Sequence, residues 1–69
     1  MTCAQIVDAA NRVSSGRYKA RSFRDGKLYV ETEAGPACYF LRQQEEKLLE
    51  DINTALGAMK VEKIIIRGV

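Results

Sequence analysis

The chain opens with apolar residues at helical spacing. They recur every three or four positions, as on one face of an amphipathic helix, and are Ile6, Val7, Ala10 and Val13. Thr2 and Gln5 have the spacing of a capping box, in which each side chain binds a free backbone N–H at the helix start. Gly16 can take the left-handed conformation that ends helices. The pattern predicts a first helix of about three turns.

Residues 17–33 alternate with period two, which predicts a β-hairpin around Asp25-Gly26. One predicted face carries Tyr18, Ala20, Ser22, Leu28, Val30 and Thr32. The other carries Arg17, Lys19, Arg21, Tyr29, Glu31 and Glu33. A two-residue loop would place Arg21 opposite Val30. A three-residue loop, with Gly26 in a left-handed bulge position, gives the pairs Ala20–Val30, Tyr18–Thr32, Lys19–Glu31 and Arg17–Glu33. We predict the longer loop, because it keeps the apolar face together and pairs opposite charges.

The second half of the chain predicts helical structure followed by a strand. Gly35-Pro36 ends the hairpin, and proline suits the first turn of a helix. The apolar helical positions are Leu41, Leu48, Leu49, Ile52, Ala55 and Leu56, ending at Gly57. Residues 42–47 are all polar, so either this stretch is exposed or a short helix turns there into a longer one. Val61 and the isoleucines at 64–66 predict a buried final strand in the centre of the sheet.

The predicted order is therefore α-β-β-(α)-α-β, an α+β fold. One domain spans residues 1–69, with a three-stranded sheet covered on one face by two or three helices. The composition agrees, because 46% hydrophobic and 29% charged residues are typical of a globular protein.

Charge is distributed unevenly along the chain. The net charge of +2 is too small to indicate a nucleic-acid partner by itself. Residues 12–27, however, carry six basic side chains and one acid, whereas residues 31–51 carry six acids and two basic side chains. The molecule is thus polarised along its sequence.

The residue inventory indicates no catalytic chemistry. The chain has no histidine to activate Cys38 or a serine, no glycine-rich phosphate loop and no cluster with metal-ligand spacing. We expect no enzyme activity, cofactor or metal. Cys3 and Cys38 are expected to be reduced thiols of a cytoplasmic protein that has no targeting segment and no contact with a membrane.

The basic hairpin is the candidate binding site. Its residues are Arg17, Lys19, Arg21, Arg24, Lys27 and Tyr29. A solvated sheet face commonly carries such charges, and Glu31 and Glu33 are expected to pair with two of them. Arg24 and Lys27, near the turn, have no obvious acidic partner and are the strongest candidates for phosphate contacts. Tyr29 on the charged face is suited equally to stacking on a base and to cross-strand packing.

Several segments together resemble the DciA family of bacterial proteins. They are residues 23–30 (FRDGKLYV), Leu41-Arg42, Leu48-Leu49, Ile52-Asn53, Gly57 and residues 61–67 (VEKIIIR). The resemblance covers most of the chain. It implies a K-homology-like domain that is associated with the replicative helicase, assists its loading and binds DNA weakly.

True K-homology domains hold the nucleic-acid backbone with a GxxG loop, where this chain has RQQE at residues 42–45. We therefore expect no sequence-specific RNA recognition of that kind. The expected partners are DNA, single- or double-stranded, and the helicase, bound by a monomer or weak dimer. The alternative is a protein–protein interaction module that does not bind nucleic acid.

Overall fold

The first helix begins where the sequence places its capping box. The computed structural model describes residues 2–69, and helix α1 spans Cys3–Val13. The Thr2 N–H donates to Gln5 Oε1 at 2.8 Å, and the Gln5 N–H donates to Thr2 Oγ1 at 3.2 Å. The helix ends before Ser15 and Gly16, both of which have positive φ angles. The predicted first helix is confirmed.

The predicted hairpin is also present, but its turn is shorter than expected. Strands β1 (Lys19–Arg24) and β2 (Lys27–Thr32) are antiparallel, and Arg24 pairs with Lys27. The loop therefore has two residues, Asp25 and Gly26, with φ angles of 51° and 79°. Positive φ at both positions is what a type I′ turn requires. The three-residue loop was a wrong prediction.

A bulge in β1 restores the predicted pairing. Ala20 pairs with Val30 and Lys19 with Glu31, as predicted, but the register shifts between Ala20 and Ser22. The extra residue therefore lies in the strand, at Arg21, instead of in the loop. Two other predictions about the hairpin fail.

First, the bulge changes which side chains share a face. Phe23, three positions after Ala20, packs against the core, whereas Ser22, predicted to share the face of Ala20, is exposed. Second, the ladder ends at Lys19–Glu31, so the pairs Tyr18–Thr32 and Arg17–Glu33 do not form in it.

Two helices follow the hairpin. They decide between the two interpretations of the polar residues 42–47, which were an exposed stretch or a short helix that turns into a longer one. Helix α2 spans Pro36–Gln43 and helix α3 spans Glu45–Leu56, with a break at Gln44. A short helix therefore turns into a longer one. Pro36 occupies the first turn of α2, and the left-handed Gly57 ends α3.

The last strand, β3 (Lys63–Gly68), lies at an edge of the sheet. The strand order is β1-β2-β3, and β3 runs parallel to β2. The prediction of a central final strand is therefore wrong, because β2 is the central strand. Ile64 and Ile66 are buried, but Ile65 faces the other side and is only partly buried. The Arg42 side chain of α2 donates to the Ile66 carbonyl oxygen at 3.2 Å and so binds one backbone group of this strand.

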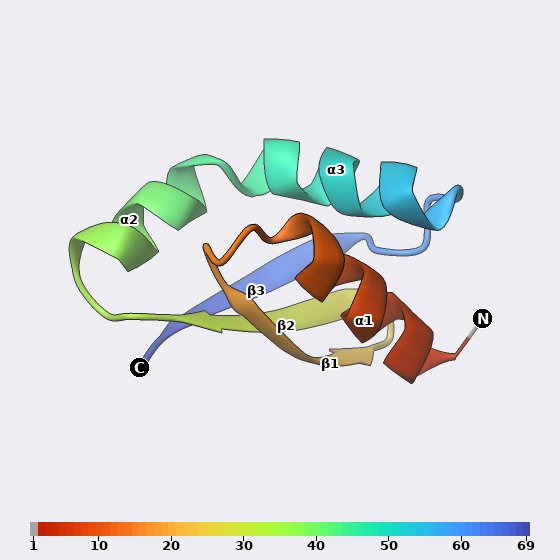
Figure 1. Cartoon of the computed structure of the whole chain (residues 1–69), viewed down its shortest axis with the longest axis horizontal. Coiled ribbons are helices and arrows are strands. Elements are labelled where there is room, and N and C mark those ends of the chain that lie inside the picture. The colour runs from red at the N-terminus through yellow and green to blue at the C-terminus, as the bar shows by residue number, and fades with distance from the viewer. Residues whose placement is uncertain (1) are drawn as a thin grey trace.

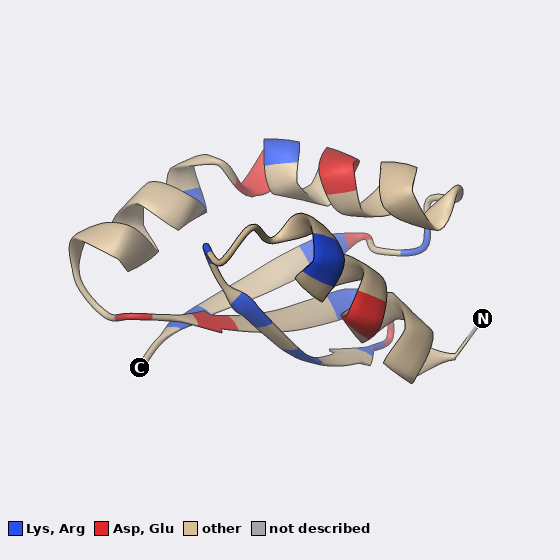
Figure 2. Ribbon diagram, viewed as in Figure 1, with Lys and Arg blue, Asp and Glu red and all other residues tan. Residues whose placement is uncertain are grey.

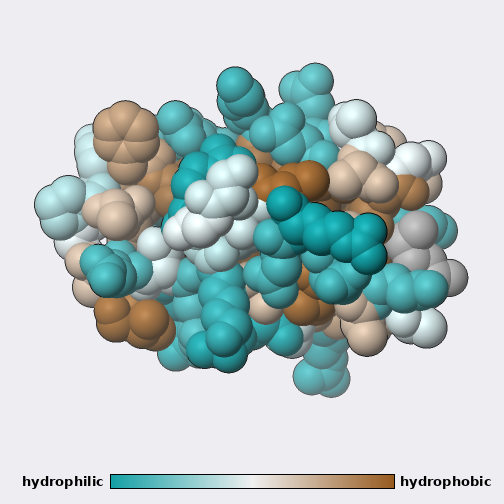
Figure 3. Space-filling view, viewed as in Figure 1, coloured by the Kyte–Doolittle hydropathy of each residue, from teal (hydrophilic) through white to brown (hydrophobic). Residues whose placement is uncertain are grey.

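All three helices lie on one face of the sheet, as predicted (Figure 1). The core between the two layers consists of Ile6, Ala10, Tyr18, Ala20, Leu28, Val30, Cys38, Leu41, Leu48, Ile52, Val61, Ile64 and Ile66. On the side of the molecule seen in Figure 3, hydrophilic residues predominate and hydrophobic ones show in small separate areas.

Two asparagines attach helices to the neighbouring backbone in the same way. The buried Asn53 amide accepts from the Val61 N–H and donates to the Val61 carbonyl, both at 2.9 Å. Asn11 makes the same two bonds to Ala20: it accepts from the N–H at 2.8 Å and donates to the carbonyl oxygen at 3.3 Å. Unlike Asn53, however, Asn11 is exposed. Asn53 thereby fixes the approach to β3, and Asn11 holds α1 against β1.

The first prediction compares these asparagines. The bonds from Asn53 to Val61 are buried, whereas those from Asn11 to Ala20 are only part-buried, so Asn53→Ala leaves two backbone groups without a partner where water does not reach. We expect a loss of about 2–4 kcal/mol in the free energy of unfolding, measured by urea denaturation. Asn11→Ala is the matched control, and about 1 kcal/mol is expected because water can replace an exposed amide. Equal losses in the two variants would contradict this account.

The second prediction concerns Tyr18, a predicted core residue that is confirmed as buried. Burial raises the pKa of its hydroxyl, with nearby Arg17 opposing the shift, and the hydroxyl donates to the Ala10 carbonyl at 3.0 Å. The folded state favours the neutral hydroxyl. The contribution of Tyr18 to stability is therefore complete below the unfolded pKa of about 10 and is lost at higher pH. Denaturation at pH 8 and pH 11 should show a larger alkaline loss for the natural chain than for Tyr18→Phe.

Candidate nucleic-acid interface

Among residues 2–69, no helix covers the second face of the sheet (Figure 1). The side chains that point into the core alternate with side chains that point away from the helices, as the pleat of each strand requires. We call this second surface the open face. Residues paired directly across neighbouring strands lie on the same face, so the strand register determines which side chains are neighbours there.

The register arranges the open face in three rows that cross the sheet. The row nearest the hairpin turn contains Arg24, Lys27 and Lys63, and we call it the cationic row. The middle row contains Ser22, Tyr29 and Ile65. The third row contains Lys19, Glu31 and Arg67. Basic residues that are far apart in the sequence thus lie on adjacent strands, about 4.8 Å apart.

The cationic row is exposed and poorly neutralised. All three of its residues are exposed. Arg24 Nε lies 3.9 Å from an Asp25 carboxylate oxygen, but both side chains are more than 80% exposed, so this pair contributes little. Within residues 2–69, no carboxylate oxygen lies within 4.0 Å of the Lys27 or Lys63 ammonium group. The row is therefore a concentration of positive charge facing solvent. Figure 2 colours the lysine and arginine positions of the chain blue.

Glu31 has a different partner from the predicted one. Lys19 lies opposite Glu31 in the ladder, but the ion pair is made by Arg21, whose Nε lies 2.6 Å from Glu31 Oε1. Arg21 is the extra residue of the bulge, and Glu31 neutralises its positive charge. Lys19 makes no ion pair in the part of the chain that the structure describes.

Arg17 lies apart from the other predicted residues, before β1 begins. Its guanidinium donates to the carbonyl oxygens of Ser14 and Val13, at 2.8 and 3.1 Å. These groups belong to the C-terminal end of α1, where free carbonyls and the helix dipole favour a cation. Arg17 therefore has a local structural role, which does not extend to the open face.

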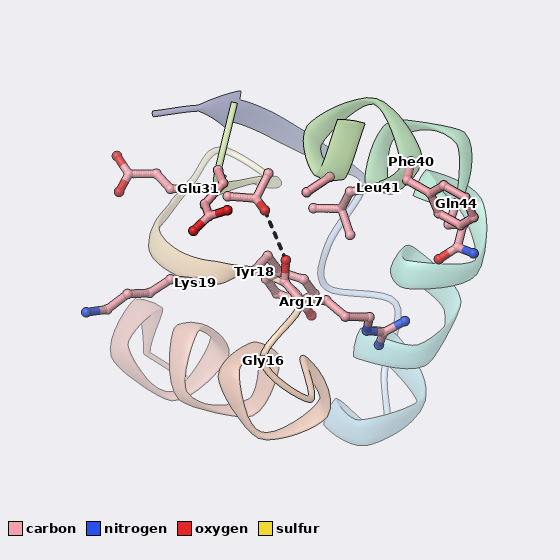
Figure 4. A pocket seen from close by; sticks show the side chains of 11 residues that line it. Gly16, Arg17, Tyr18, Lys19, Glu31, Phe40, Leu41 and Gln44 are labelled. Atoms are coloured by element: carbon pink, nitrogen blue, oxygen red, sulfur yellow. Dashed lines mark hydrogen bonds between the residues drawn. The ribbon is translucent and has the colours of Figure 1, made fainter. Parts of the chain in front are cut away.

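A groove of about 620 Å³ lies between the start of the hairpin and α2 (Figure 4). The residues that line it are Gly16, Arg17, Tyr18, Lys19, Glu31, Thr32, Glu33, Ala37, Phe40, Leu41 and Gln44. The Thr32 hydroxyl donates to the Arg17 carbonyl across its floor at 3.1 Å. Because Glu31 and Glu33 are among the lining residues, the groove suits a polyanion less well than the cationic row does.

Lys63 and Arg67 are candidate site residues that were not predicted from the sequence. They lie far from the hairpin in the sequence, and only the parallel pairing of β3 with β2 brings them beside Lys27 and Glu31. A signal was present, because both flank the isoleucines at even spacing from Ile65. That spacing places them on the face opposite Ile64 and Ile66.

No other chemistry is concentrated in the described residues. Residues 2–69 contain no group of three or more His, Cys, Asp or Glu that could hold a metal ion. Cys3 is exposed and Cys38 is buried, and both are free. None of the helices in this part of the chain is long and apolar enough to cross a membrane.

Comparison with known proteins identifies one family. The family model described as "Dna[CI] antecedent, DciA" matches residues 4–66, nearly the whole chain. Comparisons with curated proteins and with solved structures gave no match. The matched range contains all three strands except the last residues of β3, and it includes the cationic row. The chain belongs to the DciA family.

Proposed function

We propose that this protein is a non-catalytic accessory domain of the bacterial replication machinery. It binds DNA weakly through the open face and assists the replicative helicase in the cytoplasm. Membership of the DciA family supports a role like that of a helicase loader. The observation that carries the DNA-binding part is the exposed cationic row, with Lys27 and Lys63 free of ion pairs among residues 2–69.

The expected mode of binding follows from the kind of groups on this face. Lysine and arginine side chains that attract phosphates release counterions from the nucleic acid, so affinity falls steeply with salt. Phosphate contacts carry no sequence information. Lys19, Arg24 and Lys27 are the hairpin cations that remain available, because Arg21 is engaged with Glu31 and Arg17 with the end of α1.

The helical layer supports a separate contact with protein. Tyr39 and Phe40 on α2 are 66% and 63% exposed, unusual values for aromatic residues. Aromatic side chains are enriched among the residues that dominate protein interfaces. These two lie in the layer on the other side of the sheet from the open face, so one molecule can contact helicase and DNA at the same time. The same pair supports the alternative function, a protein-interaction module without nucleic-acid binding.

The third prediction tests the DNA-binding part. In fluorescence-anisotropy titrations with labelled DNA at 50 mM salt, Arg24→Glu combined with Lys27→Glu should weaken binding at least tenfold, because two cations become anions on the binding face. The matched control is Lys47→Glu with Lys60→Glu, which changes the net charge equally at exposed positions outside the open face. The control should retain the affinity within twofold to threefold.

Two results would reject this proposal. If the natural chain binds no DNA at 50 mM salt, the alternative function holds. If both double variants lose affinity equally, net charge alone is responsible and the open face is not the site.

The fourth prediction tests the helicase part by pull-down with the purified replicative helicase of the same bacterium. Tyr39→Ala with Phe40→Ala should reduce the amount of retained helicase at least tenfold, because two aromatic anchors are removed. Arg24→Glu with Lys27→Glu is the control and should retain it. Helicase that binds neither the natural chain nor the control would contradict the proposed partnership.

A further inference from the structure

The cationic row is electrostatically unfavourable in the isolated protein. Like charges directly opposite each other on neighbouring strands destabilise a sheet, and here two such pairs stand side by side, Arg24–Lys27 and Lys27–Lys63. Two acids lie close to the hairpin turn. Asp25 is in the turn, and the Glu62 carboxylate lies over Gly26, so close that a Cβ at Gly26 would meet Glu62 Oε2 at 2.5 Å. Neither forms an ion pair with Lys27 or Lys63, and an anionic ligand would relieve the repulsion.

The middle row places an aromatic ring beside these cations. Tyr29 is partly buried between Ser22 on β1 and Ile65 on β3. The register therefore places the larger Ile65 on one side of Tyr29 and the small Ser22 on the other. Beyond Tyr29, the third row contains Arg67 beside Glu31, whose carboxylate is already bound by Arg21. Positive charge therefore lies on both sides of the tyrosine.

From this arrangement we infer that the open face binds single-stranded nucleic acid across the sheet. The cationic row holds backbone phosphates, Tyr29 stacks on an unpaired base, and Arg67 contacts the backbone beyond that base. The inference rests on the proposed DNA binding and adds its substrate class and the β3 residues Lys63 and Arg67. Two strand spacings give the cationic row a width of about 10 Å, within reach of adjacent phosphates for flexible side chains.

Tyr29 is the reason for single strands in preference to duplex. Stacking on an aromatic side chain requires a base whose face is free, and in a duplex both faces are covered by neighbouring pairs. An acidic protein segment would be attracted by the same lysines and arginines but would gain nothing from the ring. Dependence on Tyr29 thus separates a single strand from both a duplex and an acidic peptide.

The fifth prediction uses the full chain with fluorescein-labelled dT20, a 20-base-pair duplex and a 20-residue polyglutamate, at 50 and 200 mM salt. The natural chain should bind dT20 most tightly. Lys63→Glu should weaken dT20 binding about fivefold to tenfold. It should also lower the slope of log affinity against log salt by about 0.7 for each phosphate that the variant no longer neutralises. Lys47→Glu, the same change on α3, should leave both quantities unchanged.

The tyrosine variants give the second part of the test. Tyr29→Leu should weaken dT20 binding at least fivefold, the lower end of the effect of removing one base–aromatic stack, and should leave duplex binding unchanged. Tyr29→Phe retains the ring and should bind as the natural chain does. Met59→Ala, which removes an exposed apolar side chain outside the open face, is the control and should have no effect. Circular dichroism establishes that each variant is folded.

NMR of the natural chain provides a readout that needs no variant. Titration with dT20 should shift the amide signals of Lys63, Tyr29 and Ile65 most strongly, and shifts confined to α2 would overturn the inference. So would DNA binding that depends on Arg24 and Lys27 but not on Lys63 or Tyr29, although the proposed function would then stand. Polyglutamate binding as tight as that of dT20 would favour an acidic protein partner. Absence of all DNA binding would reject both proposals.

Discussion

The parallel pairing of β3 with β2 is the interaction on which both the core and the candidate site depend. On one face it places Ile64 and Ile66 beside Leu28 and Val30, beneath the helices. On the other face the same register places Lys63 beside Lys27. A shift of one residue would exchange the two faces, exposing the isoleucines and burying the lysine. Because that exchange is prohibitive, the hydrophobic core itself fixes the position of Lys63 in the cationic row.

Local patterns predicted the elements well, because each depends on neighbouring residues. The capping box of Thr2 and Gln5, the Asp25-Gly26 turn and the left-handed Gly57 all act within a few positions. The turn length could not be settled in this way. Regular strands are compatible with either of two loop lengths, whereas the structure combines the shorter loop with a bulge at Arg21. Both solutions pair Ala20 with Val30, so this pair cannot distinguish them. They differ at Phe23 and Ser22, because the bulge brings Phe23 to the core and exposes Ser22.

At the candidate site, the features that the sequence did not predict likewise depend on how the elements are arranged in space. Three consecutive isoleucines favour a strand but do not reveal whether one face or both are covered, so the edge position of β3 was missed. The choice of Arg21 over Lys19 as the partner of Glu31 follows from the bulge. The capping role of Arg17 follows from where α1 ends relative to β1. Sequence alone thus located a basic hairpin, whereas tertiary structure decides which of its charges remain free.

The two layers also differ in charge, which determines the side of the molecule that attracts a polyanion. Helix α3 carries four acidic side chains and one lysine, while the open face on the other side of the sheet carries mostly cations. Since the net charge is only +2, the molecule attracts a polyanion weakly at a distance but orients it at close range. A strand held by three or four such contacts dissociates readily as salt rises. This combination fits the proposed function, which requires that the strand be held on one side, that the helical side stay free for protein, and that the strand then be released.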